Sequence, residues 1–323
     1  MTVLAVDGLR VRLPTPSGDV TVVDGVDYEV QPSEVFGIAG ESGSGKTVSM
    51  LALLGLLPEG SAVEGTARFG DDDLIAIPRR RLQSISGRDI AMVFQDPFTS
   101  LHPMLSVGKQ LTEHVRLHLG LDRKRANERA VELLSDVRIP DPHTALRRFP
   151  HQFSGGMRQR IAIAIALACG PRLLIADEPT TALDVTVQAG ILRLLDALRR
   201  ETGLSVILIT HDLGVMSAIA DSVSVFYAGR IVESGVTREV LGTPRHPYTR
   251  ALLDALPHPE GAAERELVAI AGSPPTPAAR PGGCAFHPRC AYAKPSCSEH
   301  VPELVAIGGG RTLACPIDPL ARP

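Results

Sequence analysis

Residues 40–47 read GESGSGKT and match the pattern G-x-x-x-x-G-K-[ST] in full. Glycines let successive backbone N–H groups curve around a phosphate without obstruction by Cβ atoms. Lys46 can reach the β and γ phosphates of a nucleotide, and the Thr47 hydroxyl can bind Mg²⁺. We therefore predict a phosphate-binding loop whose members are Gly40, Ser42, Gly43, Ser44, Gly45, Lys46 and Thr47.

A second group of candidate residues ends the apolar run LLIADE at 173–178. Carboxylates at the carboxyl end of a parallel strand lie where ligands bind in α/β sheets. An acidic pair after a strand is by itself more often a helix cap or a solvated strand end. In a chain that also carries a phosphate loop, we predict that Asp177 holds Mg²⁺ and that Glu178 orients and polarises the water attacking the γ-phosphate.

Residues 153–160 read FSGGMRQR. Ser154 can cap a helix, and the two glycines after it leave the first N–H groups accessible to a phosphate. This segment resembles the signature motif of the ATP-binding-cassette (ABC) ATPases. The resemblance implies that ATP is sandwiched between two subunits, with the γ-phosphate of one subunit contacted by Ser154, Gly155, Gly156 and Gln159 of the other.

The resemblance extends to three further positions. Gln95 matches the glutamine that touches Mg²⁺ and the attacking water, Asp184 ends the loop 182–184 that crosses the dimer interface, and His211 matches the switch histidine that bonds the γ-phosphate. One feature departs from the family, which usually stacks an aromatic residue on adenine. That residue would fall near Leu13, and Tyr28 is too close to the phosphate loop to replace it.

Three segments resemble the oligopeptide and dipeptide importer branch of this family, which has nickel-importing relatives: QDPFTSLHP at 95–103, HPYTRALL at 246–253 and GCAFHPRC at 283–290. They imply an ATP-hydrolysing subunit that energises peptide uptake, with a nickel or other small-solute importer as the alternative. The implied partners are a second, identical or paralogous, ATPase subunit, two membrane permeases and an extracytoplasmic solute-binding protein. A soluble ABC ATPase of DNA repair or the ribosome is disfavoured, because neither a long coiled coil nor a second cassette is present.

The C-terminal cysteines, Cys284, Cys290, Cys297 and Cys315, have the spacing C-x5-C-x6-C-x17-C. A disulfide pair is unfavourable in a reducing cytosol, zinc ligands usually come in closer pairs, and the spacing is not that of a ferredoxin. The resemblance to peptide-importer ATPases favours a [4Fe–4S] cluster with a structural role. Zinc and no metal at all stay open as alternatives.

The elements that must position these residues follow from the hydrophobic pattern. Residues 2–38 alternate as antiparallel strands, and from 155 onward helices and strands alternate as in a parallel sheet covered by helices. A helical stretch without strands lies between them, at about 98–153. The sequence thus predicts an α/β P-loop NTPase fold: an ABC-type nucleotide-binding domain over 1–256 with an antiparallel β subdomain and an inserted helical subdomain.

Composition shifts at Pro257, after which the chain is rich in Pro and Gly and poor in periodicity. We therefore predict a separate, cysteine-rich extension over 257–323 that does not continue the sheet. The net charge of −3 argues against nucleic-acid binding through phosphate neutralisation. Since the longest apolar runs are about half of the roughly 20 residues that a membrane span needs, we expect a peripheral protein on the cytoplasmic face of the cell membrane.

Overall fold

The computed structural model describes residues 2–96, 100–181, 183–256 and 269–320. Parts of three predicted segments therefore lie outside the described residues: 97–99 in the segment 95–103, residue 182 in the loop 182–184, and 257–268 and 321–323 in the C-terminal extension. The chain divides into two compact units. Unit 1 comprises 31–34 and 77–209; unit 2 comprises 2–30, 35–76 and 210–323.

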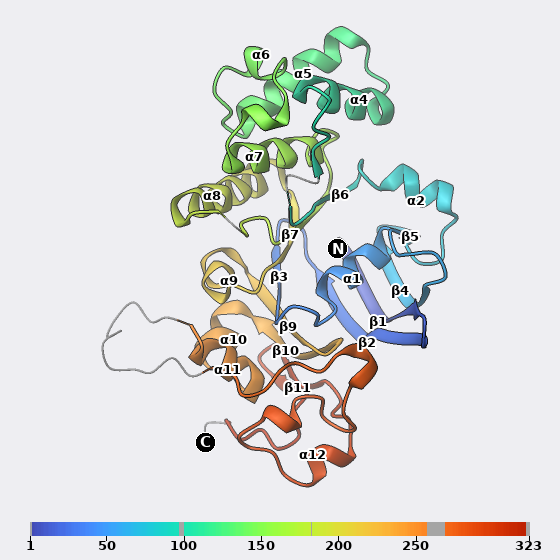
Figure 1. Ribbon diagram of the computed structural model, residues 1–323, viewed down its shortest axis with the longest axis vertical. Helices are drawn as coiled ribbons and strands as arrows, with labels where there is room; N and C mark the ends of the chain where they lie inside the picture. Colours follow the sequence, from blue (N-terminus) through green and yellow to red (C-terminus); the bar gives the residue numbers. More distant parts are fainter. Residues whose placement is uncertain (1, 97–99, 182, 257–268, 321–323) are drawn as a thin grey trace. The chain divides into compact units, whose positions relative to one another are not determined.

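Unit 1 contains a small parallel sheet in the order β8-β7-β6, covered by helices (Figure 1). Its strands are β6 (Ile90–Val93), β7 (Leu173–Asp177) and β8 (Ser205–Ile209). Its helices are α2 (Arg79–Ile85), α4 (Val107–Leu119), α5 (Arg123–Asp136), α6 (Pro142–Ala145), the 3₁₀ turn η1 (Pro150–Gln152), α7 (Gly155–Ala166) and α8 (Val185–Thr202). The strand β7 is buried along its whole length, which explains its continuous apolar run.

The helices α4, α5 and α6 pack together and against α7 in unit 1, and no strand occurs between β6 and β7 among the described residues (Figure 1). Side chains cap two of these helices: Ser106 accepts a hydrogen bond from the Lys109 N–H, and Asp122 accepts one from the Arg125 N–H. The predicted helical stretch is therefore present. Its status as a separate subdomain over 98–153 stays a prediction.

Unit 2 contains two sheets. The first is antiparallel, in the order β2-β1-β4-β5, and the second has the order β11-β12-β10-β9-β3. The strands are β1 (Leu4–Thr15), β2 (Gly18–Val30), β3 (Val35–Ala39), β4 (Ala62–Phe69), β5 (Asp72–Asp73), β9 (Ser222–Tyr227), β10 (Arg230–Val236), β11 (Val305–Gly308) and β12 (Arg311–Leu313). The helices and 3₁₀ turns are α1 (Lys46–Leu53), α9 (Leu213–Ile219), α10 (Thr237–Gly242), α11 (Pro247–Asp254), η2 (Pro277–Ala279), η3 (His287–Arg289) and α12 (Ser296–Glu299).

The C-terminal extension corrects one sequence expectation. Its strand β12 pairs antiparallel with β10, and β11 pairs with β12, so the extension does continue the sheet. The two strands have only four and three residues and are joined by a glycine turn. Strands this short show no detectable alternation. Whether residue 257 marks a domain boundary stays a prediction, since it lies outside the described residues.

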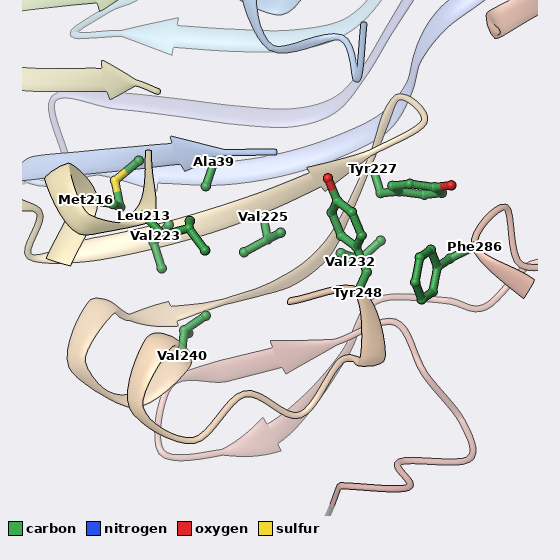
Figure 2. Close-up of a cluster of buried hydrophobic side chains, with 10 residues drawn as sticks. All are labelled: Ala39, Leu213, Met216, Val223, Val225, Tyr227, Val232, Val240, Tyr248 and Phe286. Atoms are coloured by element: carbon green, nitrogen blue, oxygen red, sulfur yellow. The ribbon is translucent and has the colours of Figure 1, made fainter. Parts of the chain in front are cut away.

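A cluster of buried side chains connects this extension to the rest of unit 2 (Figure 2). Its aromatic part consists of Tyr227 at the end of β9, Tyr248 on α11 and Phe286 of the extension. The ring centroids of the two tyrosines are 4.5 Å apart, and each lies 5.3 Å from that of Phe286. Such tilted and edge-to-face contacts add to the stabilisation from burial alone. The extension is therefore anchored in the core of unit 2.

Candidate functional site

The phosphate loop of unit 2 begins where β3 ends and closes at the first residue of α1. Three of its glycines have positive φ: 142° at Gly40, 77° at Gly43 and 99° at Gly45. A Cβ on Gly40 would overlap the Phe226 carbonyl oxygen, and one on Gly45 would lie 3.1 Å from the Val22 carbonyl oxygen. Both positions therefore require glycine for two reasons, backbone conformation and space.

Lys46 lies inside this loop, with only 5% of its surface exposed. Its ammonium donates hydrogen bonds to the carbonyl oxygens of Gly40 at 2.7 Å and Glu41 at 2.8 Å. The Ser44 hydroxyl is also buried and lies 3.4 Å from the ammonium. Thr47 is half-buried in the first turn of α1. The loop thus combines a held cation with backbone N–H groups at a helix start, an arrangement that binds anions.

Residues far along the chain support the back of this loop, and sequence reasoning gave them no role in it. The Tyr248 hydroxyl accepts a hydrogen bond from the Glu41 N–H at 2.9 Å. The Gly229 N–H donates one of 2.9 Å to the Ser44 carbonyl oxygen from the two-residue turn between β9 and β10. Ala228 and Gly229 both have positive φ, as a tight hairpin turn of this kind requires.

The second group of predicted residues gathers in unit 1, at the carboxyl end of β7. Asp177 is 3% exposed, and Glu178 follows it with a φ of 46°. The Gln95 amide donates a hydrogen bond of 2.9 Å to Glu178 Oε2, and the Thr181 hydroxyl donates one of 2.8 Å to the same oxygen. The structure therefore places Gln95 beside Asp177 and Glu178. It adds Thr181, for which the sequence gave no signal.

The conformation of Glu178 is unfavourable for a side chain of its size, since positive φ is uncommon outside glycine and asparagine. Its backbone N–H donates a hydrogen bond of 2.9 Å to the Ile209 carbonyl oxygen at the end of β8. This bond and the two bonds to Oε2 hold both ends of the residue. Backbone strain of this kind occurs most often at active sites.

The predicted signature residues form the start of α7 in unit 1. The Ser154 hydroxyl accepts a hydrogen bond of 3.4 Å from the Met157 N–H, and Gly155 and Gly156 are the first two residues of the helix. A Cβ on Gly156 would overlap a Val187 methyl group of α8. Close packing of α7 against α8 therefore requires glycine at this position, apart from any need for phosphate access. Gln159 is 1% exposed, and within the described part of the chain its Nε2 has no hydrogen-bond partner.

Of the remaining predicted residues, Asp184 and His211 are exposed. Asp184 caps α8 and accepts a hydrogen bond of 2.9 Å from the Val187 N–H. His211 follows β8 and belongs to unit 2, directly before the cap of α9. Leu13 lies half-buried on β1, and Tyr28 is buried with its ring stacked on Phe36 at 5.1 Å. Tyr28 is therefore part of the core and unavailable for stacking on a base.

The four C-terminal cysteines line one cavity of about 560 Å³ in unit 2, together with Phe286 and His287. Burial raises the pKa of Cys284, Cys290 and Cys315, so these thiols are protonated at neutral pH. All four are free thiols. As placed, the described residues contain no group of three or more His, Cys, Asp or Glu side chains that could hold a metal ion. The predicted iron–sulfur cluster is therefore not confirmed.

Among the described residues, no helix is both long and apolar enough to cross a bilayer.

Comparison with known families and proteins identifies what the chain is similar to. Residues 23–181 match the model described as ABC transporter, and residues 232–297 match that of the oligopeptide/dipeptide transporter C-terminal region. The chain is 47% identical to the oligopeptide transport ATP-binding protein OppD of Salmonella typhimurium, with 97% of this chain and 92% of that protein covered. It is 45% identical to the dipeptide transport ATP-binding protein DppD of Escherichia coli, with 100% and 99% covered.

Solved structures with the same fold are also ATP-binding cassettes. The dimeric cassette MJ0796, in a post-hydrolysis state bound to ADP and phosphate, matches with a TM-score of 0.65 and 25% identity, covering 73% of this chain and 99% of that one. The cassette cbiO1 of Clostridium perfringens matches with a TM-score of 0.63 and 27% identity, covering 75% and 91%. The predicted α/β nucleotide-binding fold is confirmed.

Proposed function

Because the chain belongs to the ABC transporter family, in its branch of oligopeptide and dipeptide transport ATP-binding proteins, we infer that it is the ATP-hydrolysing subunit of a peptide importer. The observation that carries this inference is that the similarity includes the C-terminal region typical of peptide transporters as well as the ATP motifs. The general requirements of ATP hydrolysis do not explain a match in that region.

ATP binds through its phosphates to the loop 40–47. Backbone N–H groups of the loop and the start of α1 surround the phosphates, and Lys46 exchanges its bonds to loop carbonyl oxygens for bonds to the β and γ phosphates. Thr47 and Asp177 are the residues that would hold Mg²⁺, which neutralises phosphate charge when bound. Leu13 offers apolar contact to adenine without stacking.

Glu178 orients the attacking water and accepts its proton as the oxygen bonds to the γ-phosphorus and the bond to the ADP oxygen breaks. The hydrogen bonds from Gln95 and Thr181 fix Oε2. His211 bonds the γ-phosphate from the end of β8, and Gln95 links the site to the helical stretch after it.

A second ATPase subunit, identical or paralogous, completes each site. Ser154, Gly155 and Gly156 at the start of α7 present N–H groups to the γ-phosphate bound by that partner. Gln159 and Asp184 support the same contact. The solved dimeric cassette bound to ADP and phosphate supports this arrangement by similarity of fold.

The subunit acts from the cytoplasmic face of the membrane through two permease partners, to which a separate solute-binding protein delivers the peptide. The test is to purify the chain with its permeases, reconstitute the complex in vesicles and measure ATP hydrolysis with and without peptide-loaded binding protein. We expect peptide-dependent hydrolysis and uptake, and neither with Lys46→Ala. Failure to bind permeases, together with co-sedimentation with ribosomes or DNA, would contradict the proposal.

For the cysteine cavity we keep the iron–sulfur cluster as a proposal. What supports the proposal is that four free thiols line one cavity together with apolar and aromatic residues, although as placed they do not form a metal-binding group. Cys284, Cys290, Cys297 and Cys315 would hold the cluster, which would stabilise the loops around it. Anaerobically prepared protein should contain iron and acid-labile sulfide, and Cys290→Ser should lose both. Zinc alone in the metal analysis would rule the cluster out.

A further inference from the structure

The guanidinium of Arg289, in the C-terminal extension, lies against the phosphate loop of unit 2. Its two terminal nitrogens donate hydrogen bonds to the two carboxylate oxygens of Glu41, at 2.7 and 3.0 Å. Its Nε donates to the Ala271 carbonyl oxygen at 2.9 Å. The side chain is only 5% exposed, so this is a bidentate ion pair largely removed from water.

Glu41 joins this pair to the part of the loop that binds phosphate. Its N–H donates to the Tyr248 hydroxyl, and its carbonyl oxygen accepts from the Lys46 ammonium. The carboxylate, the N–H and the carbonyl oxygen of this single residue thus have three different partners. A shift of Glu41 would move a carbonyl oxygen that positions Lys46.

The surroundings of Arg289 keep it charged and in place. The ion pair with Glu41 raises the pKa of Arg289 above its ordinary value. The guanidinium also lies 5.8 Å from the ring centroid of Tyr227 and 5.9 Å from that of Phe286, within the range of cation–π attraction. These rings belong to the aromatic cluster of Figure 2, which also holds Tyr248. The same cluster thus supports two of the three partners of Glu41, Arg289 and Tyr248.

We propose that Arg289 is a positioning residue for nucleotide binding: it acts through Glu41 to hold the phosphate loop in the shape that places Lys46. The C-terminal extension then contributes directly to the ATP site of its own subunit, besides any role in the transport complex. This rests on the proposed function, because it assumes that the loop binds ATP. The planar fork of arginine is needed, since lysine cannot form both bonds to one carboxylate.

The test is a double-mutant cycle on the whole chain with Arg289→Gln, Glu41→Gln and both together. We expect each single variant to raise the Kd for Mg-ATP about tenfold, because small displacements of positioning groups have large effects. The double variant should bind like the single variants, since all three lack the same ion pair. In the permease complex, KM for ATP should rise while kcat stays within about twofold.

A matched control is Arg245→Gln, which removes another ion pair made with the extension, to Asp318, in which no residue of the phosphate loop takes part. It should leave the Kd unchanged. A merely structural role for Arg289 predicts instead a smaller folded fraction with an unaltered Kd, which calorimetric titration and thermal unfolding separate. A Kd within twofold of the unmodified protein, or additive effects in the double variant, would overturn the proposal.

If Arg289→Gln does not fold, Glu41→Gln decides the question from the other end of the pair, because Glu41 is partly exposed and lies in a loop. An unchanged Kd in that variant overturns the proposal. If the proposed function itself is wrong, the binding measurements give a different result. In that case the unmodified chain itself does not bind Mg-ATP, or Lys46→Ala binds it equally well.

Discussion

The phosphate loop of unit 2 and the carboxylate group of unit 1 hold their functional side chains by opposite means. In the loop, the backbone positions the functional side chain. Glycines with positive φ shape the loop, and Lys46 is buried against the loop's carbonyl oxygens. At the end of β7, other side chains position the functional one. Gln95 and Thr181 donate hydrogen bonds to one carboxylate oxygen of the partly exposed Glu178.

This difference separates binding from turnover. A buried cation held by several backbone oxygens is preorganised for an anion and has little to gain between ground and transition states. A carboxylate that side-chain hydrogen bonds hold in place can take part in proton transfer. We therefore expect changes in the loop to alter ATP affinity or folding, and changes at the carboxylate group to alter the rate of hydrolysis.

The largest expected effect is that of Glu178→Gln. The amide keeps the shape of the side chain but cannot accept the proton of the attacking water, so kcat should fall by roughly a thousandfold. The Kd for Mg-ATP should stay unchanged, and gel filtration should find an ATP-bound dimer. Asp212→Asn, which changes a helix-cap carboxylate, is the control. A loss of affinity as large as the loss of rate would remove the contrast between the two regions.

Lys46→Ala should have the next largest effect, and we expect it on ATP affinity instead of on the rate of hydrolysis. Removing a charged donor to the β and γ phosphates should raise the Kd for Mg-ATP about a hundredfold, since each charge-assisted hydrogen bond contributes roughly 1.5–3 kcal/mol. Equilibrium titration with a fluorescent nucleotide measures this. The exposed Lys109 of α4 offers a control, Lys109→Ala, that should bind normally. Normal affinity of Lys46→Ala would contradict the assignment of the loop.

Gly40→Ala tests the conformation of the loop without nucleotide. The added Cβ would overlap the Phe226 carbonyl oxygen at a φ of 142°, so the free energy of unfolding should fall by about 2–3 kcal/mol. Gly43→Ala is the matched control, because nothing lies within 4 Å of its Cβ. It should cost only the roughly 1 kcal/mol of a positive φ. If denaturant unfolding gives the same loss of unfolding free energy for Gly40→Ala and Gly43→Ala, then contact with β9 does not shape the loop.

The sequence predicted each region to a different extent. Contiguous motifs located the loop and the end of β7, and the predicted alternation of helices and strands from residue 155 onward matches the order α7, β7, α8, β8, α9, β9. These features depend on hydrophobic period and local turn chemistry, which are visible in a single sequence. The fold class was predictable for the same reason.

The residues that hold each region in place from elsewhere in the chain were not predictable. Glu41 lies 207 positions from Tyr248 and 248 positions from Arg289, and their segments had been interpreted only as features of the family branch. No local pattern indicates that a distant hydroxyl or guanidinium faces a given loop. The pairing of β12 with β10 was missed because three residues are too few to show alternation.

Thr181 was missed although it lies only three residues from Glu178, because a threonine after a strand end is too common to indicate a role. Thr181→Val keeps the shape of the side chain and removes the hydrogen bond to Glu178 Oε2. Since Gln95 still bonds the same oxygen, the orientation of the carboxylate should loosen without being lost. We expect kcat to fall roughly threefold to fivefold, about the net value of one hydrogen bond, with the Kd unchanged.

Steady-state kinetics on the permease complex measures this smallest effect, and Thr202→Val is its control. The Thr202 hydroxyl bonds the Leu198 carbonyl oxygen within α8, away from the carboxylate group, so its loss should leave kcat unaltered. Combining Thr181→Val with Gln95→Ala then sharpens the comparison of the two regions. If two side chains share the positioning of Glu178, the double variant should lose more than the product of the single effects, because neither can then compensate for the other. Simple multiplication of the two effects would mean that Gln95 and Thr181 act independently.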